Sequence, residues 1–305
     1  MKHSTKIQSK IVELKNKGYS SRYIAEILGV SKSSVNDTYN KTAVEYSKKP
    51  NAKYCFIDIE TSPDIAVTFK RFKANLSQDN ILREGGVILS ISWRWMHSAT
   101  THGLALTPEE AKEGADGRLC AVLYALAETA DVMIGHNIDR FDLPCIKSRM
   151  VINRMLPMKK VKTIDTLKLA KQMRFQSNRL GSLGVALGEG DKASHSGINT
   201  WIGCLAGNED SLKEMLEYNI QDVDLLYAVY HRLAPHSNLP VNAAIFTKDT
   251  TVICPVCSSD DIVSTGNSVY TPACEYEEYE CNDCGSRHRS KTVINTKEKR
   301  KSLLV

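Results

Sequence analysis

The sequence predicts an α/β core, preceded by a small all-α module and followed by a small β module. Between residues 54 and 236, short apolar runs of the strand type alternate with helix-type patterns, which is the order of a layered α/β domain. Residues 1–45 hold three short helical patterns with glycines at their boundaries. Near the other end, two C-x-x-C pairs separated by 23 residues flank strand-like segments, which indicates a small metal-bound module.

Length and composition are those of a soluble globular protein. A chain of 305 residues with 42% hydrophobic residues can form one sizeable core with smaller satellites. No apolar run approaches the roughly 20 residues of a spanning helix, and residues 1–10 lack the apolar centre of a signal peptide. Four of the nine cysteines are paired and five are scattered, which suits a reducing compartment. We therefore expect a cytoplasmic protein without a membrane partner.

Charge is distributed unevenly along the chain. The overall net charge is +5, but residues 1–50 and residues 285–305 carry +6 each, which leaves the segment between them at −7. An acidic centre between basic ends is expected if the centre binds metal cations and the ends approach phosphates. The alternative is that the basic ends are solvated tails.

The N-terminal module begins with an apolar helical pattern that ends at Gly18. A second short helix is capped by Ser20 or Ser21 and closed by Gly29, and a third begins at Ser31, which again offers an N-cap. The apolar residues at helical spacing are Ile7, Ile11 and Leu14 in the first pattern and Ile24, Ile27 and Leu28 in the second.

The stretch GYSSRYIAEILGVSKSSVNDTYNK resembles the helix-turn-helix family. The resemblance implies that the last helix enters a DNA major groove, so its candidate base or backbone contacts are Lys32, Ser33, Ser34 and Asn36. The alternative is a three-helix packing or protein-interaction module.

Residues 54–61 place two carboxylates inside an apolar run. With the period-two alternation of a strand, Asp58 and Glu60 point to one face, while Ile57 and Ile59 point to the other. Two like charges on one face repel each other unless a cation lies between them, and hard oxygen ligands suit Mg²⁺ or Mn²⁺. The sequence thus offers half of a metal site. The alternative is an edge strand with a solvated acidic face.

A second polar cluster follows the predicted buried strand at 131–135. Ligands of α/β folds gather at the carboxyl ends of strands, and Asp142 would begin the next helix with its carboxylate turned toward the sheet. We interpret Asp139 as a cap or surface residue, and Asp165, in a strand-to-helix segment at 159–174, as a helix cap first and an acidic helper second. Strands and helices at 87–96 and 116–130 complete the alternation.

A third cluster lies on the helix predicted at 211–233. Tyr218 and Asp222 are four residues apart and share one helical face, whereas Asp224 faces away. The alternative is a half-buried core tyrosine beside a surface aspartate.

Taken together, D-x-E, N-x-x-x-F-D and Y-x-x-x-D in this order resemble the DEDD exonucleases of the RNase H-like, DnaQ-like group. The stretches FIDIETSP, GHNIDRFDLP, KTIDTLKLAK and EYNIQDVDLLYAVYHRL are similar to the YprB-like branch of phages and bacteria over residues 54–236. The resemblance implies an RNase H-like core with a mixed central sheet flanked by helices. It also implies metal ligation by Asp58, Glu60, Asp142 and Asp222, and Tyr218 places the chain in the tyrosine (DEDDy) subclass.

The two C-x-x-C pairs, Cys254 with Cys257 and Cys281 with Cys284, predict one structural Zn²⁺ bound by four thiolates. The strand-like segment between them resembles a zinc ribbon, which needs its metal to fold. Cys274 and His288 are spare potential ligands that we leave out of the site. Zinc ribbons bind nucleic acid or protein, and the basic residues beside the second pair, Arg287, Arg289 and Lys291, favour nucleic acid.

The segment 174–202 mixes basic and aromatic residues, as a surface for a nucleic-acid strand would. Arg179 and Lys192 are its candidate phosphate contacts, and Phe175 and Trp201 its candidate stacking surfaces. The alternative is a small packed helix built on Leu180, Leu183 and Leu187, with the aromatics in the core.

The predicted function is metal-dependent 3′–5′ exonucleolytic hydrolysis of nucleic acid, with DNA favoured over RNA, through two Mg²⁺ or Mn²⁺ ions. In it Tyr218 orients the attacking water, Asn137 fixes its loop and contacts substrate, and Phe141 packs beneath that loop. Alternatives are a transposase-like or guided endonuclease and a nucleic-acid-binding regulator with an inactive core. If phage-encoded, the protein would act in the host cytoplasm. The predicted boundaries are 1–45 for the helix-turn-helix, 46–53 for a linker, 54–236 for the exonuclease domain, 250–292 for the zinc ribbon and 293–305 for a basic tail.

Overall fold

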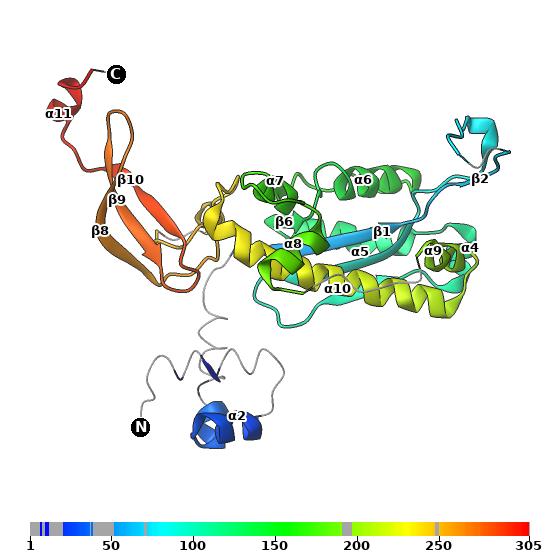
Figure 1. Cartoon of the computed structure of the whole chain (residues 1–305), viewed down its shortest axis with the longest axis horizontal. Helices are drawn as coiled ribbons and strands as arrows, with labels where there is room; N and C mark the ends of the chain where they lie inside the picture. Colours follow the sequence, from blue (N-terminus) through cyan, green and yellow to red (C-terminus); the bar gives the residue numbers. More distant parts are fainter. Residues whose placement is uncertain are drawn as a thin grey trace. The chain divides into compact units, whose positions relative to one another are not determined.

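The computed structural model describes residues 7, 10, 11, 21–36, 38, 52–69, 72–190, 197–247 and 250–304 (Figure 1). The chain divides into two compact units, residues 1–51 and residues 52–305. Most of the predicted linker, residues 46–51, lies outside the described residues. No helix in the described ranges is both long enough and apolar enough to cross a bilayer.

The first unit has a small apolar core. Helix α2 (Ser21–Leu28) contributes Ile24, which is buried together with Ile11 and Val35 from the segments before and after it. Gly29 follows α2 with φ +62°, a left-handed conformation that ends the helix. Ser31 then caps the next helical segment as predicted, because its Oγ accepts the backbone N–H of Ser34 at 3.0 Å.

The second unit is built on a five-stranded mixed sheet with the strand order β5-β4-β1-β6-β7. Strand β1 pairs in antiparallel fashion with β4 and in parallel with β6; β4 and β5 are antiparallel, and β6 and β7 are parallel. This arrangement confirms the predicted fold class. The strands are β1 (Tyr54–Thr61), β4 (Ile88–Trp95), β5 (His102–Ala105), β6 (Val132–Gly135) and β7 (Lys162–Asp165).

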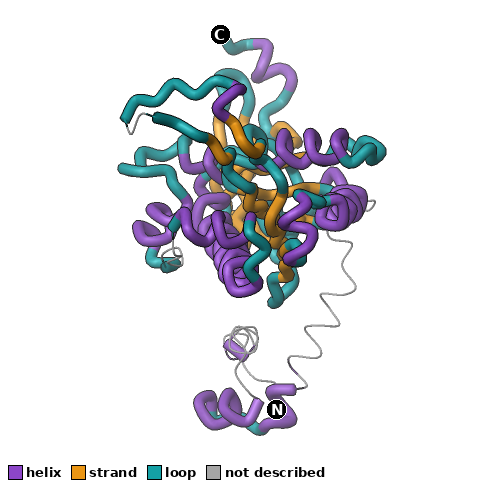
Figure 2. Tube along the Cα trace, turned by 90° about the vertical axis from the view of Figure 1, so that its right-hand side faces the viewer, coloured by secondary structure: helices purple, strands orange, loops and turns teal. Residues whose placement is uncertain are grey.

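Helices cover both faces of this sheet, as Figure 2 shows with the strands enclosed by helices. The period-two alternation of β1 decides which residue meets which layer. Cys55, Ile57 and Ile59 lie in an apolar cluster with residues of α5 and α6, whereas Tyr54 and Phe56 lie in a second cluster with residues of α7, α8 and α10. Those helices are α5 (Gly117–Thr129), α6 (Asp142–Ile152), α7 (Thr166–Ala170), α8 (Leu180–Leu187) and α10 (Glu209–Leu233).

Helix α10 is the longest helix of the described residues, and its start is fixed by side-chain capping. The side chain of Asn208 accepts the N–H of Ser211 at 2.8 Å. The shorter helices are α4 (Pro108–Glu113) and α9 (Ile198–Leu205), and α9 packs against α10 and α4. Asp165 caps α7 as predicted, because its Oδ1 accepts the N–H of Leu167 at 3.0 Å. These caps satisfy N–H groups that no helical carbonyl can reach.

A two-stranded ribbon follows β1, and the sequence pattern did not predict it. It consists of β2 (Ile65–Ala66) and β3 (Ile81–Arg83) in antiparallel pairing, with the 3-10 turn Gln78–Asn80 between them. We call residues 62–86 the β2–β3 arm. In Figure 1 the arm, in cyan, extends beyond the end of the central sheet.

The C-terminal part is a three-stranded antiparallel sheet in the order β10-β9-β8. Strands β8 (Ile262–Tyr270) and β9 (Glu275–Cys281) match the predicted strand segments, whereas β10 (Arg287–Val293) was not predicted. The short helix α11 (Lys297–Lys301) follows. This sheet is joined to the core: the Tyr230 hydroxyl donates to the Val256 carbonyl at 3.1 Å, and Cys254 and Cys281 belong to the apolar cluster that contains Phe56.

Candidate active site

Strand β1 and helix α10 bring three carboxylates together. Asp58, Glu60 and Asp222 each offer an oxygen, and these oxygens all lie within 4.8 Å of one another. Asp58 and Glu60 lie on the face of β1 opposite Ile57 and Ile59, as the alternation predicted. Asp222 is almost completely buried. Segments about 160 residues apart in the chain therefore converge on one acidic group, which is the arrangement that a divalent cation requires.

A residue that the sequence analysis missed holds this group in place. The Asn219 side-chain amide donates to Oδ2 of Asp58 at 2.6 Å, and Asn219 is fully buried. It precedes Asp222 by three residues and so shares its helical face. A polar residue at i−3 from a predicted ligand was the signal available in the sequence, since only that face of α10 can reach β1.

Asp142 approaches β1 from the other side of the site. Strand β6 pairs with β1 only as far as Phe56, and beyond that point the backbone N–H of Ile59 donates to the Asp142 carboxylate. Asp142 is only 2% exposed, and its Oδ1 has no hydrogen-bond partner among the described residues. Burial, reinforced by the nearby carboxylate of Asp165, raises the pKa of Asp142 to about 7.

This set of groups fits divalent metal ions. A buried carboxylate with an unsatisfied oxygen costs free energy that a bound cation would recover. The donor set is made of hard carboxylate oxygens, which suit Mg²⁺ or Mn²⁺ better than softer metals. Asp142 is not one of the three carboxylates that lie within 4.8 Å of one another, so it stands as a fourth, neighbouring ligand candidate.

Tyr218 is buried on α10 four residues before Asp222, on the same helical face. Two other aspartates turn elsewhere. Asp224 accepts hydrogen bonds from Arg94 at 3.0 Å and from Thr101, in agreement with its predicted orientation away from the site. Asp139 forms an ion pair with Lys168 at 2.6 Å.

A hollow of about 790 Å³ lies at the carboxyl end of β6, between the loop that follows this strand and the start of α8. Asn137 and Arg179, both predicted substrate contacts, line it. Asn137 adopts the left-handed conformation with φ +71°, and its backbone N–H donates to Oδ1 of Asp165 at 2.9 Å. The carboxylate that caps α7 thereby also fixes the backbone of this loop.

The remaining predicted substrate contacts lie in different surroundings. The Trp201 indole N–H donates to the Thr61 carbonyl at 3.1 Å, and its ring packs partly against the core. In the first unit Lys32 is exposed, Ser34 is half-buried, and Asn36 accepts a hydrogen bond from Ser21 at 2.6 Å. Lys192 lies outside the described residues. Segment 180–187 is the packed helix α8, which was the alternative interpretation for its leucines.

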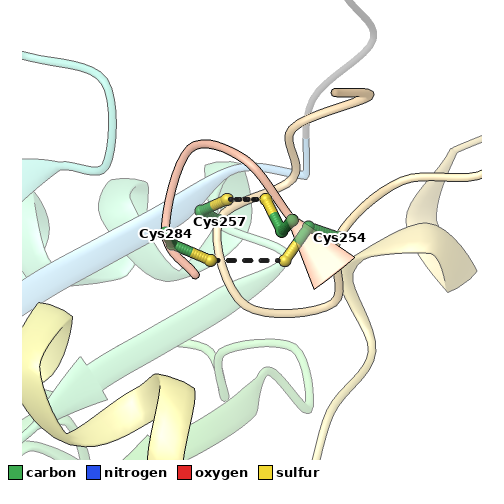
Figure 3. A group of neighbouring side chains, drawn as sticks. Cys254, Cys257 and Cys284 are labelled. Atoms are coloured by element: carbon green, nitrogen blue, oxygen red, sulfur yellow. Dashed lines mark hydrogen bonds between the residues drawn. The ribbon is translucent and has the colours of Figure 1, made fainter. Parts of the chain in front are cut away.

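The four cysteines of the C-x-x-C pairs form a second metal-type group. Their sulfur atoms lie within 4.8 Å of one another, with 3.6 Å between Cys254 and Cys284 and between Cys257 and Cys281. Figure 3 shows the thiols of Cys254, Cys257 and Cys284 gathered at the two turns. Four sulfurs at Zn–S distances of ~2.3 Å would be separated by ~3.8 Å in a tetrahedron, so the group fits Zn²⁺.

The two spare ligands left out of this group by the sequence analysis remain outside it. His288 lies beside the cluster, with its Nε2 atom 3.8 Å from Cys254 Sγ and 2.8 Å from Ser286 Oγ. It is therefore placed to orient the cysteines through hydrogen bonds.

A family model described as the RNase_H superfamily matches residues 88–234. The matched segment begins at β4 and ends with α10, so it contains Asp142 and Asp222 but not the β1 pair. The mixed sheet and this match indicate an RNase H-like fold, and in it the carboxylates of β1 and α10 converge.

Among solved structures, the chain is similar to the family B DNA polymerase from the hyperthermophilic archaeon Pyrobaculum calidifontis, with 12% sequence identity and a TM-score of 0.45. The likeness covers 61% of this chain and 25% of the polymerase, so the chain spans about a quarter of that protein's length. No curated protein matches the chain.

Proposed function

We propose that the protein is a metal-dependent 3′–5′ exonuclease that hydrolyses the phosphodiester bonds of nucleic acid. The observation that carries the proposal is the convergence of Asp58 and Glu60 from β1 with Asp222 from α10 within 4.8 Å. Three carboxylates at this distance repel one another strongly unless they share cations. A site for divalent metal in an RNase H-like domain is best explained by phosphodiester hydrolysis.

In this proposal Asp58, Glu60 and Asp222 hold one Mg²⁺ or Mn²⁺ ion and Asp142 serves the second. The bound ions would activate a water molecule and stabilise the charge that develops on the phosphate and the leaving 3′ oxygen. The protein holds the carboxylates in a fixed position relative to one another. Asn219 fixes Asp58 through a 2.6 Å hydrogen bond, and the Ile59 N–H fixes Asp142.

Tyr218 orients the attacking water in this scheme. Tyr218 is buried on the same face of α10 as Asp222, and burial restricts its ring to few rotamers. Its hydroxyl group would therefore keep one position relative to the scissile phosphate. The Y-x-x-x-D spacing also supports the choice of an exonuclease, because it resembles the tyrosine subclass of the DEDD group.

DNA is the favoured polymer because the N-terminal stretch resembles a helix-turn-helix, whose last helix fits the major groove of B-form DNA and not the narrow one of A-form RNA. We infer that the Cys₄ group holds one structural Zn²⁺ and that the basic C-terminal strands approach phosphates. Arg287 and Arg289 lie on β10, next to this group in sequence.

The test is a Mg²⁺-dependent degradation assay on 5′-labelled single strands of DNA and RNA. The wild-type protein should give a ladder of labelled products that shorten from the 3′ end. Asp58→Asn or Asp222→Asn should lower the rate by about 1,000-fold, or ~4 kcal/mol, because each removes one charge from the metal site. The matched control is Asp224→Asn, which makes the same change on the same helix, where the carboxylate pairs with Arg94. Undiminished cleavage by both site variants would refute the site, and internal cuts would indicate an endonuclease.

A further inference from the structure

The β2–β3 arm, residues 62–86, is the direct continuation of the strand that carries Asp58 and Glu60. Its root is held firmly on the core. The backbone groups of Ser62 exchange hydrogen bonds with Val87 and Gly86, both at 2.8 Å. The Arg83 guanidinium donates to the carbonyls of Leu205 at 3.1 Å and Ala111 at 2.7 Å.

The crossing of the two chain segments at this root leaves no space for a side chain. A Cβ atom added to Gly85 would lie 2.6 Å from the Pro63 carbonyl carbon and from the Ser62 carbonyl oxygen. The Gly85 N–H also donates to Oδ1 of Asp64 at 2.7 Å. The direction in which the arm leaves the active-site strand is therefore set by close backbone packing.

The outer part of the arm has the opposite character. Phe69 is 102% exposed and Phe72 is 81% exposed, and neither ring belongs to an apolar cluster of the described residues. Leu76 is also exposed. Two whole aromatic rings held in water forgo the stabilisation that burial would bring. Such a surface is expected where another molecule covers it.

The charge of the outer part of the arm indicates which kind of molecule would cover it. In the sequence, residues 67–77 include three basic side chains and no acidic one, in the run Phe-Lys-Arg-Phe-Lys from Phe69 to Lys73. Lys73 is exposed, whereas Lys70 and Arg71 lie outside the described residues. The acidic residues of the arm are Asp64, Asp79 and Glu84, all outside that segment. Aromatic rings between positive charges complement a chain of bases and phosphates.

We propose that the outer part of the β2–β3 arm is a docking surface for a single-stranded segment of the nucleic-acid substrate, with unpaired bases stacked on Phe69 and Phe72. This inference rests on the proposed function in taking nucleic acid as the polymer that reaches the carboxylates. Only unpaired bases offer both ring faces for stacking, because the faces of paired bases are covered by their neighbours in the duplex. The arm would hold the strand while its end lies beside β1.

The test compares the Phe69→Ala/Phe72→Ala double variant with the wild-type protein. Binding of a fluorescein-labelled oligothymidylate is followed by fluorescence anisotropy without added Mg²⁺, so that cleavage is not needed for the readout. Loss of one stacked base typically weakens binding about 5- to 150-fold, so the double variant should bind at least about 10-fold more weakly. Its thermal unfolding should change little, because both rings are exposed and neither belongs to an apolar cluster of the described residues.

The matched control is Val151→Ala/Ile152→Ala, which trims two other exposed apolar side chains, 75% and 62% exposed, at the end of α6. It should keep wild-type affinity. Equal affinity of the arm variant and the wild-type protein would overturn the proposal and leave the arm to a protein partner. A comparable loss in the control variant would overturn it as well, since stacking on these two rings would not then be specific.

A second substrate separates this inference from the proposed function. Thymidine 5′-(p-nitrophenyl phosphate) contains one nucleotide and no strand to dock, so its kcat and KM should be the same in the arm variant and the wild-type protein. Reduced hydrolysis by the arm variant would overturn docking as the role of the rings. If the wild-type protein hydrolyses neither this ester nor oligonucleotides, the proposed function fails, while the anisotropy result still decides whether the arm binds a single strand.

Discussion

Asn219 offers the most direct test of how the chain positions its metal ligands. Asn219→Ala removes a 2.6 Å hydrogen bond to Oδ2 of Asp58 and leaves all four candidate ligands in place. Hydrogen bonds to charged groups are worth about 1.5–3 kcal/mol. If that free energy is expressed in metal binding, it corresponds to a factor of about 10–150 in the Mg²⁺ concentration at half-maximal activity. Loss of residues that orient metal ligands commonly weakens binding by about 10- to 100-fold.

The assay is the rate of oligonucleotide degradation measured across a Mg²⁺ titration. We expect the half-saturating concentration to rise and high Mg²⁺ to restore much of the rate, because the carboxylates themselves remain. The matched control is Asn153→Ala, which removes another amide-to-carboxylate bond, from Asn153 to Asp116 at 2.8 Å. The control should lower stability without changing the titration. An unchanged Mg²⁺ requirement in Asn219→Ala would refute the positioning role.

Three further predictions concern stability. Arg149→Leu removes the partner of Asp116, whose carboxylate is fully buried and bonded to the guanidinium at 2.6 and 3.0 Å; urea unfolding should show a loss of about 3–5 kcal/mol, and adding Asp116→Asn should recover part of it. Burial lowers the pKa of His231, so the folded state disfavours protonation of this imidazole. The neutral side chain therefore contributes its full stabilisation above the unfolded pKa of 6.5, and the free energy of unfolding declines below that pH by at most about 1.4 kcal/mol per pH unit. His231→Gln should remove this part of the pH dependence when the free energy of unfolding is measured from about pH 7.5 to 5.5. Cys257→Ser should lower zinc content and thermal stability together, and a variant that keeps one tightly bound zinc per chain and full stability would contradict the Cys₄ assignment.

Periodic sequence patterns correctly predicted the strands and helices that have one buried face. Alternation in β1 placed Asp58 and Glu60 on a common face, and the four-residue spacing on α10 did the same for Tyr218 and Asp222. The structure brings these faces of β1 and α10 together. From the sequence, this proximity could be expected only because the order of the motifs resembles that of a known family.

The elements that were missed lack such a face. Strands β2 and β3 have two and three residues, too few to show a period. Strand β10, with the sequence RHRSKTV, is largely polar, and no position of it is buried. Asn219 and the Ile59 N–H act through tertiary contacts, on Asp58 and Asp142, that no local pattern records.

The packing of the Cys₄ turns against the core also bears on how the chain folds. Tyr54 and Phe56, at the start of the central strand, share one apolar cluster with Val256 and Cys281, about 200 residues later in the chain. Contacts at such sequence separation form late and slow the search for the native state. The α/β core therefore gains part of its cooperativity from turns that are synthesised about 200 residues after its central strand. During synthesis, the strand that carries Asp58 and Glu60 stays without this cover until those turns have left the ribosome.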